Sequence, residues 1–178
     1  LPFPPSPTGS LDISVDLSTT AWNHETRLSS NKPGHFQWLL GTYYLDSDAD
    51  VVSRYLPANI IPDGDANRYS KALSFFGEFS YAFLEEKLTL LGGLRTFNDN
   101  RGVTLSANSP ATEGNFNSIN PRFNLAFRPD KQSNYFINIA NGFRSGQFNN
   151  PALLPIFESF GLKIQPNIDS DQLWSYEL

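Results

Sequence analysis

The sequence predicts an all-β chain whose antiparallel strands form part of a transmembrane β-barrel. Three observations lead to this prediction. Large apolar side chains alternate with small or polar ones along several segments, which is the period of a strand with two unlike faces. Short turns alternate with long polar connections between these segments. Only 17% of the 178 residues are charged while 14% are aromatic, and the mean hydropathy is −0.35; this balance is too apolar for disorder and too polar for helical membrane spans.

The first predicted hairpin surrounds the turn Asn-Lys-Pro-Gly at residues 31–34. Before the turn, residues 25–29 alternate between Glu, Arg and Ser on one side and Thr and Leu on the other. After it, Phe36, Trp38 and Leu40 alternate with Gln, Leu and Gly. The two faces differ less here than in the hairpins that follow.

The second predicted hairpin has the clearest alternation. Residues 73–83 place Leu, Phe, Phe, Tyr and Phe at positions 73, 75, 79, 81 and 83, with mainly small residues between them. A polar break at 85–87 follows, and then Leu88, Leu90 and Leu94 resume the alternation. Two such runs separated by a few residues indicate an antiparallel pair.

The third predicted hairpin repeats this arrangement. Phe, Leu and Phe occupy positions 123, 125 and 127, and Tyr, Ile and Ile occupy positions 135, 137 and 139. The polar segment 129–134 lies between them and predicts a turn. The three hairpins together predict six strands.

The connections on the other side of these hairpins are long. Residues 56–70, 98–120 and 147–171 are rich in Pro, Asn, Asp, Ser or Gly, whereas most connections in compact domains have about 4–6 residues. Outer-membrane barrels pair short periplasmic turns with long extracellular loops. Residues 1–10 contain four prolines and predict an extended loop or linker. Since the sequence starts at Leu1 without a methionine, we expect it to be part of a longer chain.

The apolar face of these strands must be covered by lipid or by protein. Aromatic residues near the short turns favour lipid, because outer-membrane barrels carry aromatic girdles at the membrane interface. The predicted interface aromatics are Trp38, Tyr81, Phe83, Phe127 and Tyr135. The alternative is a soluble β-sandwich, such as a carbohydrate-binding module that uses exposed aromatic rings.

Composition excludes several other functions. A net charge of −5 argues against a nucleic-acid partner, which would meet a basic patch. The absence of cysteine excludes disulfides and thiolate metal sites. His24 and His35 are the only histidines and no serine motif lies near them, so we expect no catalytic triad and no enzyme.

Asp46, Asp48 and Asp50 have the spacing of the first ligands of a calcium loop. That loop requires Gly at its sixth position and Glu at its twelfth, and Val51 and Pro57 stand there instead. We therefore expect a solvated strand end, no metal site and no cofactor.

The order of the segments resembles the barrel of TonB-dependent outer-membrane receptors. Glu-Lys-Leu-Thr-Leu-Leu-Gly-Gly-Leu-Arg at 86–95 is similar to an ascending strand of that family, and Asn-Pro-Arg-Phe-Asn-Leu-Ala-Phe-Arg-Pro at 120–129 to the next descending strand. Asn-Gly-Phe-Arg-Ser-Gly-Gln-Phe-Asn at 141–149 resembles the family's Gly-Phe-Arg segment, and residues 174–178 resemble the start of the following strand. Residues 25–30 and 36–44 fit an earlier hairpin of the same barrels.

The resemblance implies that residues 1–178 are part of one plugged barrel domain of about 22 strands. With the strand that begins at Trp174, this sequence supplies about seven of them, from the number of residues that a membrane strand needs. It implies an active transporter in the outer membrane of a Gram-negative bacterium that takes up ferric siderophores or a similar scarce nutrient. It also implies TonB as the energising partner, through an N-terminal part that this sequence does not contain. Outer-membrane lipid and lipopolysaccharide are the other implied partners.

Strand parity then assigns candidate ligand-binding residues to the lumen. If Phe123 and its companions face lipid, Arg122 and Asn124 face inward, and the same reasoning turns Arg95 and Arg144 inward. Asn141 and Phe148 join them near the expected outer mouth. Arginines at a lumenal mouth suit anionic ligands such as ferric catecholates. The alternative is that these arginines pair with carboxylates of the plug or of neighbouring strands.

Overall fold

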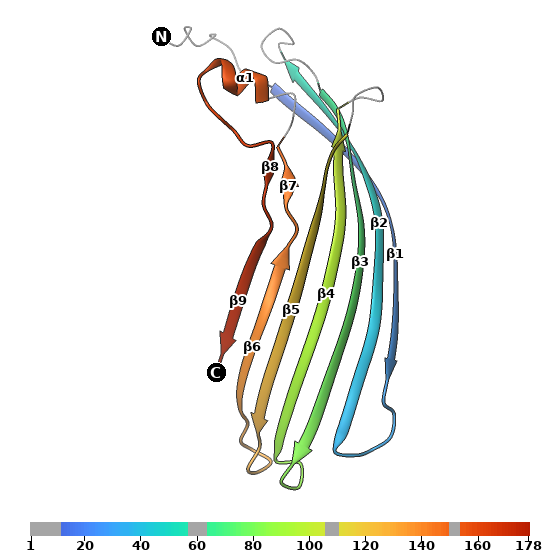
Figure 1. Cartoon of the computed structure of the whole chain (residues 1–178), viewed down its shortest axis with the longest axis vertical. Helices are drawn as coiled ribbons and strands as arrows, with labels where there is room; N and C mark the ends of the chain where they lie inside the picture. The colour runs from blue at the N-terminus through green and yellow to red at the C-terminus, as the bar shows by residue number, and fades with distance from the viewer. Residues whose placement is uncertain (1–11, 57–63, 106–110, 150–153) are drawn as a thin grey trace.

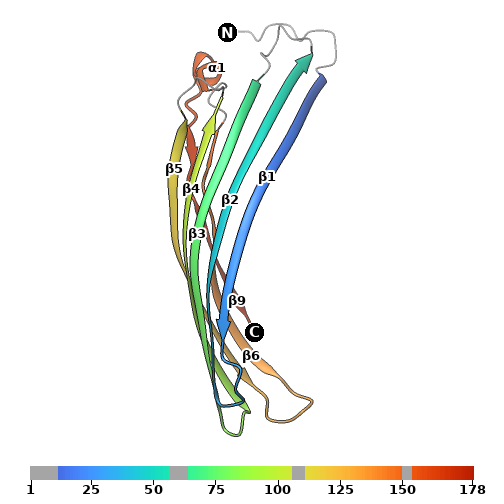
Figure 2. The ribbon, with the colours of Figure 1, turned by 90° about the vertical axis from the view of Figure 1, so that its right-hand side faces the viewer.

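The chain forms one large antiparallel sheet. The computed structural model describes residues 12–56, 64–105, 111–149 and 154–178, so the predicted linker at 1–10 lies outside the described residues. Seven strands pair in the order β1-β2-β3-β4-β5-β6-β9 and lie side by side as a curved wall (Figures 1 and 2). Their bounds are β1 Asp12–Ser29, β2 Phe36–Leu56, β3 Gly64–Phe83, β4 Leu88–Thr104, β5 Thr112–Phe127, β6 Tyr135–Arg144 and β9 Asp171–Glu177. The predicted all-β antiparallel fold and its seven strands are confirmed.

The three short turns lie together at one end of the wall, at the bottom of Figure 1. They join β1 to β2, β3 to β4 and β5 to β6, as the sequence predicts. Asp130 shapes the third turn, because its carboxylate accepts the backbone N–H groups of Gln132 and Ser133, both at 2.8 Å. The N–H of Gln132 is the main reason why the pKa of Asp130 lies below its ordinary value.

The long connections are shorter than the sequence predicts. β3 begins at Gly64, β4 runs to Thr104 and β5 begins at Thr112, so much of 56–70 and 98–120 is strand. In these extensions polar residues occupy both faces, so period two is absent from the sequence although the backbone ladder continues. The first half of β1 was also not predicted, although Ile13, Val15 and Leu17 alternate there with Asp12, Ser14 and Asp16.

The segment 147–171 is also more ordered than predicted. β7 (Gln147–Phe148) pairs with β8 (Asn167–Ile168), and the short helix α1 (Leu154–Ser159) lies between them. Gly161 ends the helix with φ +76°, and the N–H of Leu162 reaches back to the carbonyl of Phe157 at 3.0 Å, the hydrogen bond of a Schellman motif. Among the described residues, no helix is long and apolar enough to cross a membrane.

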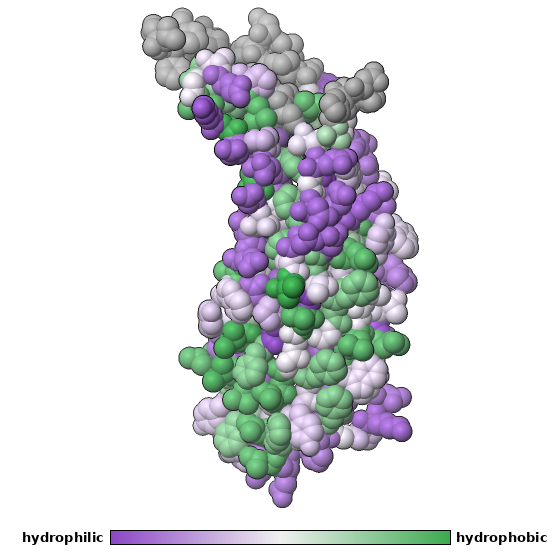
Figure 3. Space-filling view, in the orientation of Figure 1, coloured by the Kyte–Doolittle hydropathy of each residue, from purple (hydrophilic) through white to green (hydrophobic). Residues whose placement is uncertain are grey.

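The wall has two faces. The apolar face carries the side chains in phase with Phe79, and the polar face carries those in phase with Arg122. Along β3 the apolar face is formed by residues 73–83, about 11 residues, which matches the 9–11 that a membrane strand needs. Above this band the paired row Asp46, Lys71 and Asn100 is polar. Figure 3 shows the same division, with apolar side chains gathered over the lower part of the wall and polar ones above.

The most buried side chains lie on the polar face. They are small or polar rather than large and apolar: Ala72, Ser74, Asp99, Val103, Ser118 and Ala126. Within residues 12–56, 64–105, 111–149 and 154–178, the second sheet is only the two-stranded pair β7-β8. No sheet of the described residues covers the apolar face as in a β-sandwich.

The ladder between β5 and β6 is incomplete. It pairs only residues 122–127 with 135–140 and ends at Arg122 opposite Ala140. The next residue is Pro121, which has no backbone N–H to donate. Above this point β6 leaves β5 and pairs with β9 alone (Figure 1).

Candidate functional site

Arg95 lies at the centre of the polar face, as parity predicts. Its guanidinium carbon is 5.6 Å from the ring centre of Phe97, 5.8 Å from that of Phe76 and 5.9 Å from that of Tyr43. Its Nε donates to the hydroxyl of Ser74 at 2.8 Å. No carboxylate of the described residues pairs with it, so three aromatic rings hold the cation and its terminal nitrogens stay available.

Phe76 joins Arg95 to a second arginine. Arg27 of β1 lies 5.8 Å from the same ring, which is thus shared by two guanidinium groups. The ring lies close over Gly41 of β2: a Cβ added there would come within 2.3 Å of the Phe76 ring and 2.9 Å of the carbonyl oxygen of Thr26. Glycine is therefore required at position 41 for the ring to reach this place.

Arg122 and Asn124 lie on the polar face closer to the turns. Arg122 pairs with Glu78, with 3.3 Å between Nη1 and Oε1, so the alternative of a carboxylate from a neighbouring strand holds for this residue. Asn124 is half-buried opposite Leu91 and Asn138. A cavity of about 350 Å³ brings Arg95 and Arg122 together with Asn141.

Arg144, Asn141 and Phe148 lie where β6 has separated from β5. Arg144 forms an ion pair with Asp171 of β9 and is exposed. Asn141 is only 9% exposed, and neither its Oδ1 nor its Nδ2 has a hydrogen-bond partner within the described residues. A second cavity, of about 450 Å³, places Arg144 and Asn141 beside Arg95. Phe148 is more distant and packs on Phe116, with 6.1 Å between ring centres.

Asp99 organises the upper part of the polar face, and the sequence analysis missed it. The carboxylate is fully buried and accepts hydrogen bonds from Arg101 Nε at 2.5 Å, Ser145 Oγ at 2.6 Å and Ser70 Oγ at 2.7 Å. Arg101 also donates to the carbonyl of Gly146 at 3.3 Å. These bonds fasten the segment after β6 to β3 and β4. No local sequence motif predicts a contact between residues 46 positions apart, so the sequence held no signal that could have identified Asp99.

The five predicted interface aromatics all lie on the apolar face at the turn end. Phe83, Phe127 and Tyr135 share one row through Leu88. Tyr81 lies in the next row and contacts Phe83, with 4.5 Å between ring centres. Trp38 pairs with Phe79 one row further.

A second group of aromatic residues at the upper boundary of the apolar band was not predicted. Trp22 of β1 and Tyr44 of β2 pack with 5.6 Å between ring centres. Both are in phase with the apolar face. The alternation around Trp22 is too weak to identify it from the sequence.

Asp46, Asp48 and Asp50 of β2 lie above the apolar band. Asp48 and Asp50 are exposed and accept hydrogen bonds from Asn67 at 2.7 and 3.1 Å. They do not form the expected strand end, because β2 continues to Leu56 and keeps its pairing with β3 beyond Asp50. In the same region the hydroxyl of Tyr69 donates to Glu113 at 2.6 Å. This bond, aided by desolvation and by the negative charge of Glu113, raises the pKa of Tyr69 to about 12.

The two histidines lie apart from this site. His24 shares a hydrogen bond of 2.9 Å with Thr26, and His35 stacks on Tyr81 near the first turn. Neither contacts a serine and a carboxylate in the way that a catalytic triad requires.

Comparison with known proteins gives one consistent result. A family model described as "TonB dependent receptor-like, beta-barrel" matches residues 4–178. The ferric yersiniabactin uptake receptor FyuA from Yersinia pestis is similar at 14% identity and a TM-score of 0.66, over 96% of this chain and 27% of that one. The unliganded ferric citrate transporter FecA is similar at 13% identity and a TM-score of 0.72, over 95% of this chain and 26% of that one.

A third solved structure, the alcaligin outer membrane receptor FauA from Bordetella pertussis, is similar at 14% identity and a TM-score of 0.61, over 93% of this chain and 26% of that one. The chain thus spans about a quarter of the length of the structures that it matches. At these identities the likeness establishes the shared fold.

Proposed function

The chain belongs to the β-barrel family of TonB-dependent receptors, and we propose that it is a stretch of wall in an outer-membrane transporter that takes up a ferric siderophore or a similar iron chelate with energy from TonB. In this proposal residues 1–178 are part of one barrel domain. The apolar face meets outer-membrane lipid and lipopolysaccharide, and the polar face lines the lumen. The chain acts by binding and catalyses no reaction.

The cluster around Arg95 is the observation that carries the proposal. Arg95 is exposed on the polar face, and its guanidinium is oriented by rings and a hydroxyl rather than by a carboxylate. A guanidinium oriented in this way keeps its terminal N–H donors free for a bidentate contact with a carboxylate or phenolate. The three rings add flat surfaces on which an aromatic ligand group can stack.

The neighbouring residues support the same use of this face. Asn141 supplies unpartnered amide atoms beside Arg95, and each unsatisfied buried polar atom costs roughly 1–3 kcal/mol. Arg144 adds positive charge at the rim, where the ion pair with Asp171 is exposed and therefore weak. Arg122 is placed to position Glu78 and the wall rather than the ligand, and Asn124 and Phe148 lie outside the linings of the two cavities beside Arg95.

The solved relatives are described as receptors or transporters for ferric yersiniabactin, ferric citrate and alcaligin. These ligands belong to those proteins and indicate the chemical class that we propose for this one. A soluble sandwich is not supported, because the described residues form one wall whose apolar face carries no second sheet.

Uptake by the full-length receptor tests the proposal. We expect Arg95→Gln to lower the uptake of a negatively charged ferric siderophore at least tenfold, since the substitution removes the charge while keeping much of the side chain. Arg128→Gln, at the turn end of the wall, is the matched control and should leave uptake unchanged. Equal uptake by wild type and Arg95→Gln, across ferric citrate and a set of catecholate and hydroxamate chelates, would show that Arg95 is not a ligand contact.

A further inference from the structure

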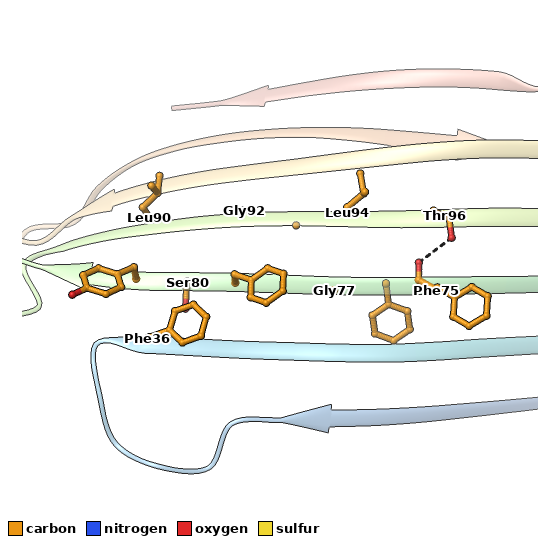
Figure 4. Close-up of a pocket in the computed structure, with 12 residues that line it drawn as sticks. Phe36, Phe75, Gly77, Ser80, Leu90, Gly92, Leu94 and Thr96 are labelled. Carbon is orange, nitrogen blue, oxygen red and sulfur yellow. Dashed lines mark hydrogen bonds between the residues drawn. The ribbon is translucent and has the colours of Figure 1, made fainter.

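The upper half of β5 has one edge without a partner strand. β5 pairs with β4 along its whole length, but its ladder with β6 ends at Arg122 opposite Ala140. Among the residues that the structure describes, no backbone group of 112–120 bonds to a strand other than β4. Figure 4 shows the ordinary arrangement lower in the wall, where β3 has β2 on one side and β4 on the other. The open edge therefore lies in the middle of the sheet and not at its outer border.

The register shows which backbone groups face this open edge. In an antiparallel ladder every second residue of a strand bonds to one neighbour, and the residues between them face the other side. Next to the end of β5, the N–H of Arg128 donates to the carbonyl of Lys87 beside β4, at 2.7 Å, and the register with β4 is uninterrupted along 112–127. Even-numbered residues therefore bond to β4, and the open edge receives the N–H and C=O groups of Glu113, Asn115, Asn117 and Ile119. Pro121 has the same parity, so its missing N–H leaves the ladder with β4 complete.

β6 does not close this edge, because the chain that continues it is held elsewhere. Phe143 packs on Phe97 of β4, with 5.8 Å between ring centres. Ser145 donates to the buried carboxylate of Asp99 at 2.6 Å. Both partners lie on the polar face of β4, so the chain turns toward that face instead of following β5. Figure 1 shows the resulting divergence of β6 from β5.

A cavity of about 450 Å³ lies along the open edge. Residues 112–117 line one side of it, and Phe148 with residues from 166 to 170 lines the other. Consecutive residues of a strand point to opposite faces, so a space that contacts all of them lies beside the strand rather than over one face. Of the described residues that line this cavity, Glu113 and Asp169 are acidic and none is basic.

We propose that this edge binds an extended peptide segment of a partner protein, in which apolar and basic side chains alternate. Its backbone would pair with the open groups of β5, as in other cases of strand addition. Its apolar side chains would lie toward Phe116 and Phe148, whose ring centres are 6.1 Å apart. Its basic side chains would lie on the opposite side, where Glu113, Asn115 and Asn117 are exposed. The proposal goes beyond nutrient uptake and does not depend on it.

Two other occupants fit this edge less well. A second copy of the receptor would bring a broad wall, and residues from 166 to 170 of the same chain already bound the far side of the cavity. A glycan would bond to the polar side chains, but it has no repeat that matches backbone groups on alternate residues of a strand. A single extended peptide satisfies both conditions.

A short fluorescein-labelled peptide of alternating lysine and valine tests the proposal. Its binding to the full-length receptor in detergent micelles is measured by fluorescence anisotropy. Asn117→Pro removes an open N–H and obstructs the added ladder, so we expect it to weaken binding roughly tenfold, the loss of one or two hydrogen bonds. Asn117→Ala is the matched control, because it loses the same side-chain amide and keeps the backbone N–H. It should bind the peptide as the wild type does.

Modified peptides test the same edge without a change in the receptor, which matters if Asn117→Pro does not fold. In one peptide the amides of the valines are methylated, and in another those of the lysines. Since one of these two sets must face β5, we expect one of the two peptides to bind roughly tenfold more weakly than the unmodified one. A peptide with glutamate in place of lysine should also bind more weakly. The unmodified peptide should slow hydrogen exchange in residues 113–119.

Equal binding to Asn117→Pro and Asn117→Ala overturns the proposal, as does equal binding of the unmodified peptide and both methylated ones. No binding of the unmodified peptide up to about 1 mM, which corresponds to about −4 kcal/mol, overturns it as well. Slowed exchange in residues 138–144 without any change in 113–119 would place the peptide on β6 and would also overturn it. Siderophore uptake by the same variants is a separate measurement, so failure of the proposed function is distinguished from failure of this inference.

Discussion

Gly41 offers a direct test of how the polar face is built. In Gly41→Ala the new methyl group would lie 2.3 Å from one carbon of the Phe76 ring and 2.6 Å from another. Carbon atoms are best separated by about 3.5–4.0 Å, so the ring must move by roughly 1 Å or more. The carbonyl oxygen of Thr26, 2.9 Å from the methyl group on the other strand, limits the escape of the backbone.

The expected cost has two parts. Overpacking a tight site costs typically about 1–3 kcal/mol. Moving the ring also weakens its contacts with Arg27 and Arg95, each of which contributes about 0.5–1 kcal/mol when partly exposed. We therefore expect Gly41→Ala to lower the free energy of unfolding by about 2–3 kcal/mol, the sum of these parts with some relaxation.

Urea unfolding of the full-length receptor in detergent micelles, followed by tryptophan fluorescence, measures this loss. Gly92→Ala is the matched control, because its methyl group enters open space and should change the free energy by less than about 0.5 kcal/mol in the destabilising direction. A change of midpoint at constant slope identifies an effect on stability rather than on the unfolded state. If Gly41→Ala and Gly92→Ala unfold at the same urea concentration, the argument that Phe76 requires a glycine beneath it is refuted.

Three further predictions concern the polar contacts. Asp99→Ala should lower the free energy of unfolding by about 2–4 kcal/mol, because it removes a buried carboxylate that accepts three hydrogen bonds, while Arg101, 31% exposed, is partly compensated by solvent. Hydrogen exchange should then rise in residues 145–148; unchanged exchange there would contradict the fastening role. Because the pKa of Tyr69 is raised, its protonated form stabilises the fold; this stabilisation is fully present below the ordinary pKa of 10 and is lost as the pH rises toward about 12. Glu113→Gln should move the pKa of Tyr69 back toward 10 in an NMR titration of isotope-labelled tyrosine. An unmoved pKa would exclude Glu113 as the cause. Arg122→Gln should cost no more than about 1 kcal/mol, because its ion pair with Glu78 is exposed, and a double-mutant cycle with Glu78→Gln that gives a larger coupling would refute this.

The strands inside the apolar band could be predicted because two environments act on them. Residues such as Leu73 and Phe83 need an apolar surrounding while Ser74 and Glu78 do not, so alternation is written into the sequence. Near Asn98 and Asn117 both faces are polar, and the asparagines bond to one another across the strands. The ladder continues there without any hydrophobic pattern, which is why the loops were predicted to be too long.

The candidate site was predictable only in part. Parity placed Arg95 on the polar face, since it depends on counting residues from the strand's apolar positions. The close contact of the Phe76 ring with Gly41 depends on the register between β2 and β3, which the turns and the whole sheet set together. The hydrogen bond between Asp99 and Ser145 joins residues that are 46 positions apart in the sequence. Neither can be obtained from one strand alone.

The ladder that stops at Pro121 has a mechanical consequence. Below it, every neighbouring pair from β1 to β6 is hydrogen-bonded, so a lateral load is shared by a continuous band. Above it, β6 and the segment after it are attached to β4 and β5 by the hydrogen bonds of Asp99 and by the ring contacts Phe97–Phe143 and Phe116–Phe148, without a backbone ladder to β5. The wall is therefore stiff along the apolar band and jointed above it, and a displacement at one level need not be transmitted to the other.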